Sequence, residues 1–156
     1  GSDPTDLSLR CAKALTLFQG KTTVVIGPLF SRALAQKLNA WAQGHANRHV
    51  TFAPKTLAPL IASHGLAIGR PGLIRYEAAA LGRTSIFLSE TDGYQDYFKS
   101  FIKSGLAEIY FANDPEDRDR FYARLRQIAG LDLNDPIFEP NANAKEQVPL
   151  GGAPVY

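Results

Sequence analysis

Short β-branched runs alternate with amphipathic helical stretches along most of this chain, and that alternation limits the folds it can adopt. The run Thr22-Thr23-Val24-Val25-Ile26 has no polar alternation, which is typical of a strand buried on both faces. Gly27-Pro28 ends this run, and the same strand-then-helix pattern recurs up to about residue 129. Repeated β-α alternation with short connections predicts an α/β fold in which helices cover both faces of a parallel sheet.

Turn residues and hydrophobic spacing give the bounds of the expected elements. Asp3 is a favoured N-cap residue and Pro4 suits the first helical position, so the first helix is expected to begin there and to end before Gln19-Gly20. After Gly130 the periodicity is lost, and we expect an irregular tail over 131–156. The expected strands span 22–26, 49–52, 66–68, 84–88 and 107–111, and the expected helices span 3–18, 31–43, 56–62, 73–81, 94–103 and 114–129.

Composition excludes several classes of protein. With 156 residues of which 45% are hydrophobic, the chain can build a core and is not wholly disordered. It has no apolar run near the roughly 18–20 residues that a membrane span requires. The single cysteine, Cys11, excludes an intramolecular disulfide and a cysteine zinc site, and it favours a cytoplasmic location. The three histidines lack metal-site spacing, so we expect no metal: His45, His49 and His64.

Charge is distributed unevenly along the chain. Residues 1–89 hold ten Lys/Arg against three acids, a net of +7, whereas residues 90–156 hold seven against twelve, a net of −5. A basic half indicates an anionic partner such as a phosphorylated ligand or a nucleic acid, or simply a solvated surface. The basic residues are dispersed and lack a recognition motif or an aromatic platform, so nucleic acid ranks last.

Three glycine-bearing turns are candidates for binding phosphate. They are Gly1–Pro4, Gly27–Phe30 and Gly69–Gly72, and each precedes a predicted helix. Ligands of open parallel sheets bind outside the carboxyl ends of the strands, where free N–H groups and positive helix ends face the same crevice. A diphosphate suits that geometry, although glycines also end strands for steric reasons alone.

Glu77 is the candidate that would recognise a ribose. It is the only acid between Asp6 and Glu90, and it lies among alanines in the helix that follows Gly72. A carboxylate at this place can accept hydrogen bonds from both ribose hydroxyls. The alternative is an exposed helix glutamate paired with Arg75 or Arg83.

Several of these runs resemble a known family of proteins. Gly1-Ser2-Asp3-Pro4, residues 23–30, and the stretch from Leu66 through Gly82 are similar to the C-terminal half of the PseG/SpsG-like family, which includes UDP-sugar hydrolases of pseudaminic acid biosynthesis. The stretch through Gly82 also resembles the central motif of the wider GT-B glycosyltransferases related to MurG, and Gln95 resembles the glutamine of their next element. The resemblance covers roughly residues 1–112. It implies a three-layer, Rossmann-like α/β/α domain over residues 1–130, with five to six parallel strands, which would be the C-terminal half of a GT-B fold.

The resemblance also implies what each turn does. The loop from Gly69 to Gly72 would face the diphosphate, Glu77 would hold the ribose, and the base would lie near the end of the strand at 49–52. No cofactor is implied, because the UDP-sugar is the substrate, and the catalytic residues belong to an N-terminal half that nothing here matches. The positions expected to contact the nucleotide are Gly1, Ser2, Gly27, Pro28, Phe52, Gly69, Arg70, Gly72, Arg75, Glu77 and Gln95.

Two functions are therefore carried forward. The first is the UDP-sugar-binding domain of a nucleotide-sugar hydrolase or glycosyltransferase of bacterial surface-polysaccharide or nonulosonic acid biosynthesis, inactive without its partner half. Because the sequence begins inside the matching motif, we expect a longer protein. The alternative is a degenerate half that serves as a binding module. It is favoured by Leu73-Ile74-Arg75, which replaces the family's small hydroxyl residues, and by the acidic link Glu90-Thr91-Asp92-Gly93-Tyr94.

Overall fold

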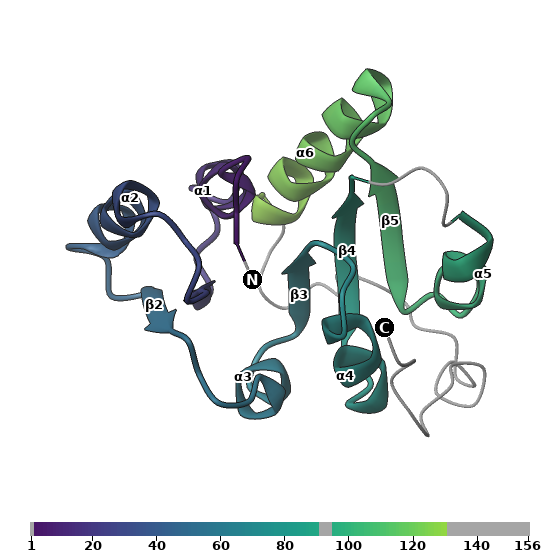
Figure 1. Ribbon diagram of the computed structural model, residues 1–156, viewed down its shortest axis with the longest axis horizontal. Coiled ribbons are helices and arrows are strands. Elements are labelled where there is room, and N and C mark those ends of the chain that lie inside the picture. The colour runs from purple at the N-terminus through teal and green to yellow at the C-terminus, as the bar shows by residue number, and fades with distance from the viewer. Residues whose placement is uncertain (1, 91–94, 131–156) are drawn as a thin grey trace. The chain divides into compact units, whose positions relative to one another are not determined.

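The computed structural model describes residues 2–90 and 95–130, with the backbone alone for 95–98. Helices and parallel strands alternate along this part of the chain, as predicted, so the protein is of the α/β class (Figure 1). The elements in order are α1 (Leu7–Ala14), β1 (Thr22–Ile26), α2 (Arg32–Ala42), β2 (Arg48–Phe52), α3 (Ala58–Ala62), β3 (Leu66–Gly69), α4 (Ile74–Ala80), β4 (Thr84–Ser89), α5 (Gln95–Lys103), β5 (Ala107–Phe111) and α6 (Pro115–Ala129).

The chain divides into two compact units. Of the described residues, unit 1 comprises 2–55 and 122–130, and unit 2 comprises 56–90 and 95–121. Helix α6 therefore begins in unit 2 and ends in unit 1. Each unit has its own sheet and its own hydrophobic core.

Unit 1 contains a two-stranded parallel sheet. Strands β1 and β2 pair in a register that sets Ile26 opposite Phe52. Helix α2 begins at a serine cap, because the Ser31 hydroxyl accepts a hydrogen bond from the backbone N–H of Leu34 at 3.1 Å. The buried core joins α1, β1 and α2 and consists of Leu9, Ile26, Leu34 and Leu38.

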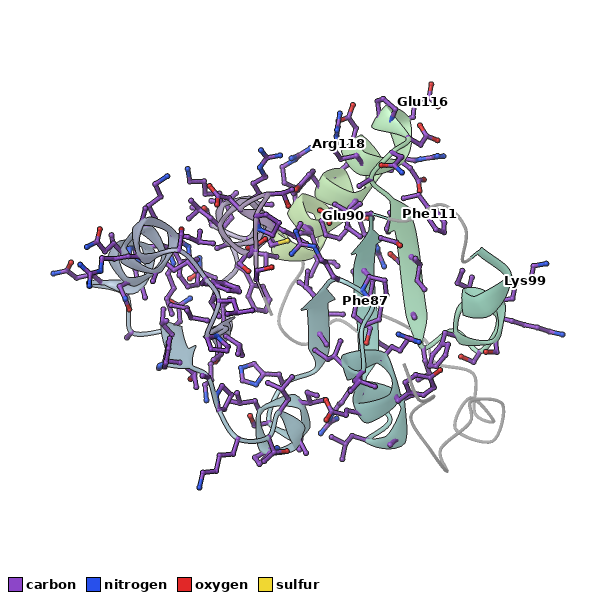
Figure 2. The ribbon with its side chains drawn as sticks, in the orientation of Figure 1. Phe87, Glu90, Lys99, Phe111, Glu116 and Arg118 are labelled. Carbon is purple, nitrogen blue, oxygen red and sulfur yellow. The ribbon has the colours of Figure 1, made fainter. Side chains whose placement is uncertain are left out.

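Unit 2 contains a three-stranded parallel sheet in the order β3-β4-β5. All six residues of β4 are buried, as expected for a central strand of a parallel sheet. Phe87 of β4, labelled in Figure 2, packs in a core that α4 and α5 also supply through Ala79 and Phe101. On β5, the Tyr110 ring meets Phe121 of α6 edge to face, with centroids 5.9 Å apart.

The single sheet of five to six strands is not what the described residues form. They form one sheet of two strands and one of three, all parallel. The hydrophobic pattern predicts each strand because the pattern lies within the strand's own few residues. It does not predict which strand edges pair, since pairing depends on contacts between distant segments.

Helix α1 is shorter than predicted at both ends, spanning Leu7–Ala14. Its predicted first residues form a turn instead, in which the backbone N–H of Asp6 donates to the carbonyl of Asp3 at 3.3 Å. Near the other end, the Thr16 hydroxyl donates to the carbonyl of Lys13 at 2.7 Å. Side-chain bonds of this kind compete with the next helical bond, and the helix ends there.

Candidate functional site

Five of the eleven predicted site residues lie on the loop and helix that follow β3 at the carboxyl edge of the unit 2 sheet. Because the three strands are parallel, their carboxyl ends lie at the same edge, with Gly69 opposite Phe87 and Ser89 opposite Phe111. Figure 2 shows Glu90 and Phe111 close to the ends of β4 and β5. The predicted loop, residues 69–72, leaves β3 at this edge and leads into α4.

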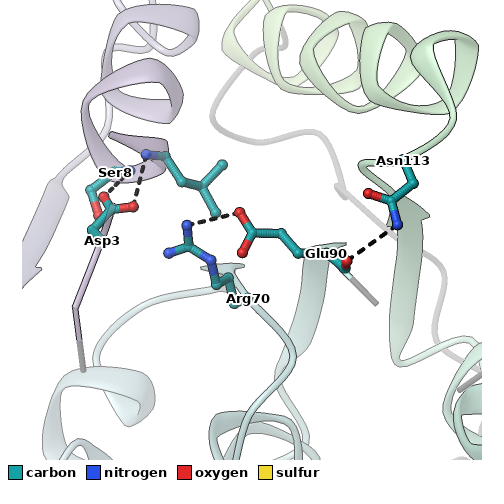
Figure 3. A network of polar contacts seen from close by, with 6 residues as sticks. Asp3, Ser8, Arg70, Glu90 and Asn113 are labelled. Atoms are coloured by element: carbon teal, nitrogen blue, oxygen red, sulfur yellow. Dashed lines mark hydrogen bonds and ion pairs between the residues drawn. The ribbon is translucent and has the colours of Figure 1, made fainter. Parts of the chain in front are cut away.

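A partly exposed ion pair links that loop to the residue that follows β4. A guanidinium nitrogen of Arg70 lies 3.1 Å from a carboxylate oxygen of Glu90, and the two side chains are 29% and 41% exposed. The Asn113 amide, in the turn after β5, donates to the Glu90 carbonyl at 3.4 Å. Figure 3 shows the three residues in a row along the edge. Such a pair adds only about 0–1 kcal/mol, so Arg70 can exchange its carboxylate partner for another anion.

The loop glycines are not explained by the protein's own packing. A Cβ atom added at Gly69 or at Gly72 would meet no heavy atom of the described residues within 4 Å, and neither residue has the left-handed backbone that favours glycine. Neither sterics nor conformation therefore requires glycine here. Open space beside two glycines at a strand end is where a ligand can approach the backbone closely.

Arg75 has a structural role in unit 2, where its side chain is buried. Its side chain is only 3% exposed, and its guanidinium lies over the Tyr76 ring, 4.6 Å from the centroid. It donates to the carbonyl of Gly72 at 2.8 Å. These contacts fix the end of the loop from inside the unit. Of the two arginines predicted near the diphosphate, Arg70 is the less buried, with 29% of its side chain exposed.

Glu77 lies in the first turn of α4 and is half-buried. Neither arginine named as its alternative partner contacts it: Arg75 bonds to the Gly72 carbonyl, and Arg83 donates to the Ala62 carbonyl at 2.7 Å. Within the described residues, the Glu77 carboxylate has no hydrogen bond or ion pair. A half-buried acid in this state keeps its acceptor oxygens available for a ligand.

The turn at the start of the chain differs from its prediction. The Asp3 carboxylate accepts hydrogen bonds from the backbone N–H groups of Leu7 and Ser8, at 2.9 and 2.8 Å (Figure 3). Asp3 is 6% exposed. The first amides of α1 are thus taken by the protein's own anion and are not free for phosphate, while the exposed Ser2 lies outside this cap.

The carboxyl edge of the unit 1 sheet is apolar and exposed. Phe52 ends β2 with 69% of its surface exposed, and Leu29, in the turn that contains Gly27 and Pro28, is 72% exposed. The next residue, Ala53, has a φ of 37°, which is rare for a residue with a Cβ, and its N–H donates to the Ile26 carbonyl at 2.8 Å. Strained backbone beside exposed aromatic surface is frequent at ligand sites.

The predicted residues thus fall into two sets. Unit 2 holds Gly69, Arg70, Gly72, Arg75 and Glu77 on one loop and helix, and unit 1 holds Ser2, Gly27, Pro28 and Phe52.

Two of the predicted positions are not covered. Gly1 lies outside the described residues, and Gln95 begins α5 but its side chain is not described.

Sequence reasoning missed the contact of Asn113 and the strain at Ala53. The Asn113-Asp114-Pro115 sequence after β5 indicates a turn, which is a signal for the Asn113 contact. No local sequence feature indicates the strain at Ala53.

Comparison with protein-family models, with curated proteins and with solved structures found no match for this chain. Across residues 2–90 and 95–130, no helix is long and apolar enough to cross a membrane. In the same residues, no three side chains of His, Cys, Asp or Glu are grouped as a metal site would need.

Proposed function

We propose that this chain is the UDP-sugar-binding domain of a GT-B-like nucleotide-sugar hydrolase or glycosyltransferase that acts in the cytoplasm. The observation that carries the proposal is in unit 2, where an open glycine loop, a partly exposed arginine and a half-buried glutamate lie on one loop and helix, and the glutamate side chain has no hydrogen bond or ion pair among the described residues. The glycine loop would bind a diphosphate, the arginine would balance its negative charge, and the glutamate would bind a ribose.

The diphosphate would lie against the loop. A ligand could approach the backbone closely at Gly69 and Gly72, because no atom of the described residues fills that space. The Arg70 guanidinium would leave Glu90 and bind phosphate oxygens through two N–H donors, which is the geometry arginine favours. As the anomeric bond breaks, negative charge grows on the leaving UDP, and the arginine would stabilise it.

Glu77 would hold the ribose, because its two acceptor oxygens suit the two ribose hydroxyls. Phe52, Ser2, Gly27 and Pro28 belong to unit 1, and their contact with the nucleotide stays a prediction from the sequence. Catalysis would need groups from a second domain, so the chain alone should turn over no UDP-sugar.

The fold that this function requires is a single Rossmann-like sheet of five to six strands. All described strands are parallel and alternate with helices, which supports it. Among the described residues, β1 has one neighbouring strand and so does β3.

Calorimetry with UDP, uridine and 2′-deoxy-UDP tests the proposal. Glu77→Gln keeps the shape but loses the charge and one acceptor, so UDP affinity should fall by about 1–3 kcal/mol while the free energy of unfolding stays unchanged. The native chain should prefer UDP to 2′-deoxy-UDP, and the variant should discriminate much less.

A second variant tests the diphosphate contact. Arg70→Gln should weaken UDP but not uridine, whereas Lys103→Gln, which removes an exposed charge elsewhere in unit 2, should leave both affinities unchanged. If the chain binds UDP no better than uridine, and Glu77→Gln changes nothing, the nucleotide site is wrong. The degenerate binding module then becomes the better function.

A further inference from the structure

A second cluster of charge lies in unit 1, on the side of α1 that faces the end of α6. These two helix segments border a shallow, open concavity of about 400 Å³. Figure 1 shows α1 beside the yellow-green, C-terminal end of α6. The lining residues are Arg10, Lys13, Ala14, Tyr122 and Arg126.

Three of the five lining residues are cations, and none is an acid. Arg10, Lys13 and Arg126 are exposed, and none of their side chains has a hydrogen bond or an ion pair within the described residues. The neighbouring arginine on α6 differs, because Arg124 donates to the Gln127 amide oxygen at 2.9 Å. Three uncompensated positive charges around one hollow repel one another unless an anion joins them.

Helix dipoles do not account for this arrangement. Lys13 and Arg126 stand in the last turns of their helices, where a cation is favourable. Arg10 stands earlier in α1 and gains little from that effect. No acid occurs in α1, and none occurs in α6 beyond Asp119. Asp6 lies four residues before Arg10, but the two side chains form no ion pair among the described residues.

We propose that this concavity is a second anion site, separate from the loop at 69–72, and that it binds a small phosphorylated molecule. A phosphate ester or diphosphate carries enough negative charge for three cations, and the two arginine forks match its oxygens. Ala14, Tyr122 and the aliphatic stems of the cations form an apolar wall for the body of the ligand. The volume is in the range of small-molecule sites.

Titration of the 15N-labelled chain with inorganic pyrophosphate tests this site by NMR. Amide signals of residues 10–14 and 122–126 should shift in a saturable way. The triple variant Arg10→Gln, Lys13→Gln, Arg126→Gln should weaken binding at these signals at least about tenfold, the effect of losing one or more charge-assisted hydrogen bonds. The matched control Lys21→Gln, Lys37→Gln, Lys55→Gln removes the same charge from exposed positions of unit 1 and should retain the affinity.

The result can overturn the proposal in three ways. Equal loss in both triple variants would mean general attraction to a basic unit. No saturable shift at residues 10–14 would mean no site. Tighter binding of a polyglutamate peptide, with the same dependence on the three cations, would assign the surface to an acidic protein segment instead. If the triple variant does not fold, Arg126→Gln alone should still weaken pyrophosphate. Signals from residues 69–77 report the proposed nucleotide site separately, so each site can fail without the other.

Discussion

The two units bury their strands to different degrees. In unit 2, all six residues of β4 are buried, whereas in unit 1 only Ile26 of β1 is buried and no residue of β2 is. A strand buried throughout must be flanked by other strands and covered on both faces, as β4 is flanked by β3 and β5. The half-buried strands of unit 1 have only each other. Unit 2 therefore has the more complete core, and unit 1 depends more on helix packing and polar contacts.

The units also differ in charge. Residues 1–55 hold seven Lys/Arg and two Asp, a net of +5, while residues 56–121 hold seven Lys/Arg and nine acids, a net of −2. Many of the charges of unit 2 are matched locally, as in Arg70 with Glu90 and Arg120 with Asp117 at 2.9 Å. In unit 1, Asp3 is committed to a helix cap. Unit 1 thus carries the larger excess of positive charge.

The largest expected effect compares one substitution in the two cores. Phe87→Ala removes a fully buried ring of unit 2 and should cost about 3–5 kcal/mol. Phe30→Ala removes a half-buried ring that packs on the unit 1 core, and about 1–2 kcal/mol is expected from the smaller area buried. Denaturant unfolding, with amide hydrogen exchange to separate the units, measures both. An equal or greater loss at Phe30 would show that unit 1 is packed as completely as unit 2.

A smaller loss of stability is expected from removing either of two carboxylates that bind backbone amides. Asp3 is buried and accepts from two amides in unit 1, while the half-buried Asp117 accepts from the amide of Phe111 at 2.6 Å in unit 2. Asp3→Ala should therefore cost about 2 kcal/mol and Asp117→Ala about 1 kcal/mol. Asp3→Asn, which keeps an acceptor, should lose less than the alanine. A greater loss at Asp117 in thermal unfolding would contradict the dependence of unit 1 on its polar cap.

The smallest effect compares two glycines that both have open space around them. Gly44 in unit 1 has a φ of 78°, so Gly44→Ala should cost about 1 kcal/mol. Gly72 in unit 2 has no such φ, and Gly72→Ala should be neutral or stabilise by up to about 1 kcal/mol. The same Gly72 variant should weaken UDP, because its methyl group would occupy the space proposed for the diphosphate. A variant with unchanged UDP affinity would make this loop a simple turn.

Most secondary-structure elements could be predicted because their signals are local. The β-branched run of β1 and the glycine that ends β3 lie within the elements that they signal. The ends of α1 could not be predicted in this way. The Asp3 carboxylate binds the Leu7 amide from four residues before it, and the Thr16 hydroxyl, beyond Ala14, binds the Lys13 carbonyl. The position of a helix end depends on which side chain forms a hydrogen bond with the terminal backbone groups, and hydrophobic spacing alone does not show that.

By itself, the sequence determined the α/β class, the strand and helix order, and the loop, arginine and glutamate that form the candidate site. Only the tertiary structure decided that Arg75 is buried against Tyr76, that Glu77 pairs with neither nearby arginine, and that Arg10 and Arg126 line one hollow. It also decided that β1 pairs with β2 while β3, β4 and β5 form their own sheet. The physical reason is the range of the interaction. Periodicity and turn preference act between residues a few positions apart, whereas burial of a charge and pairing of strand edges depend on segments that only folding brings together.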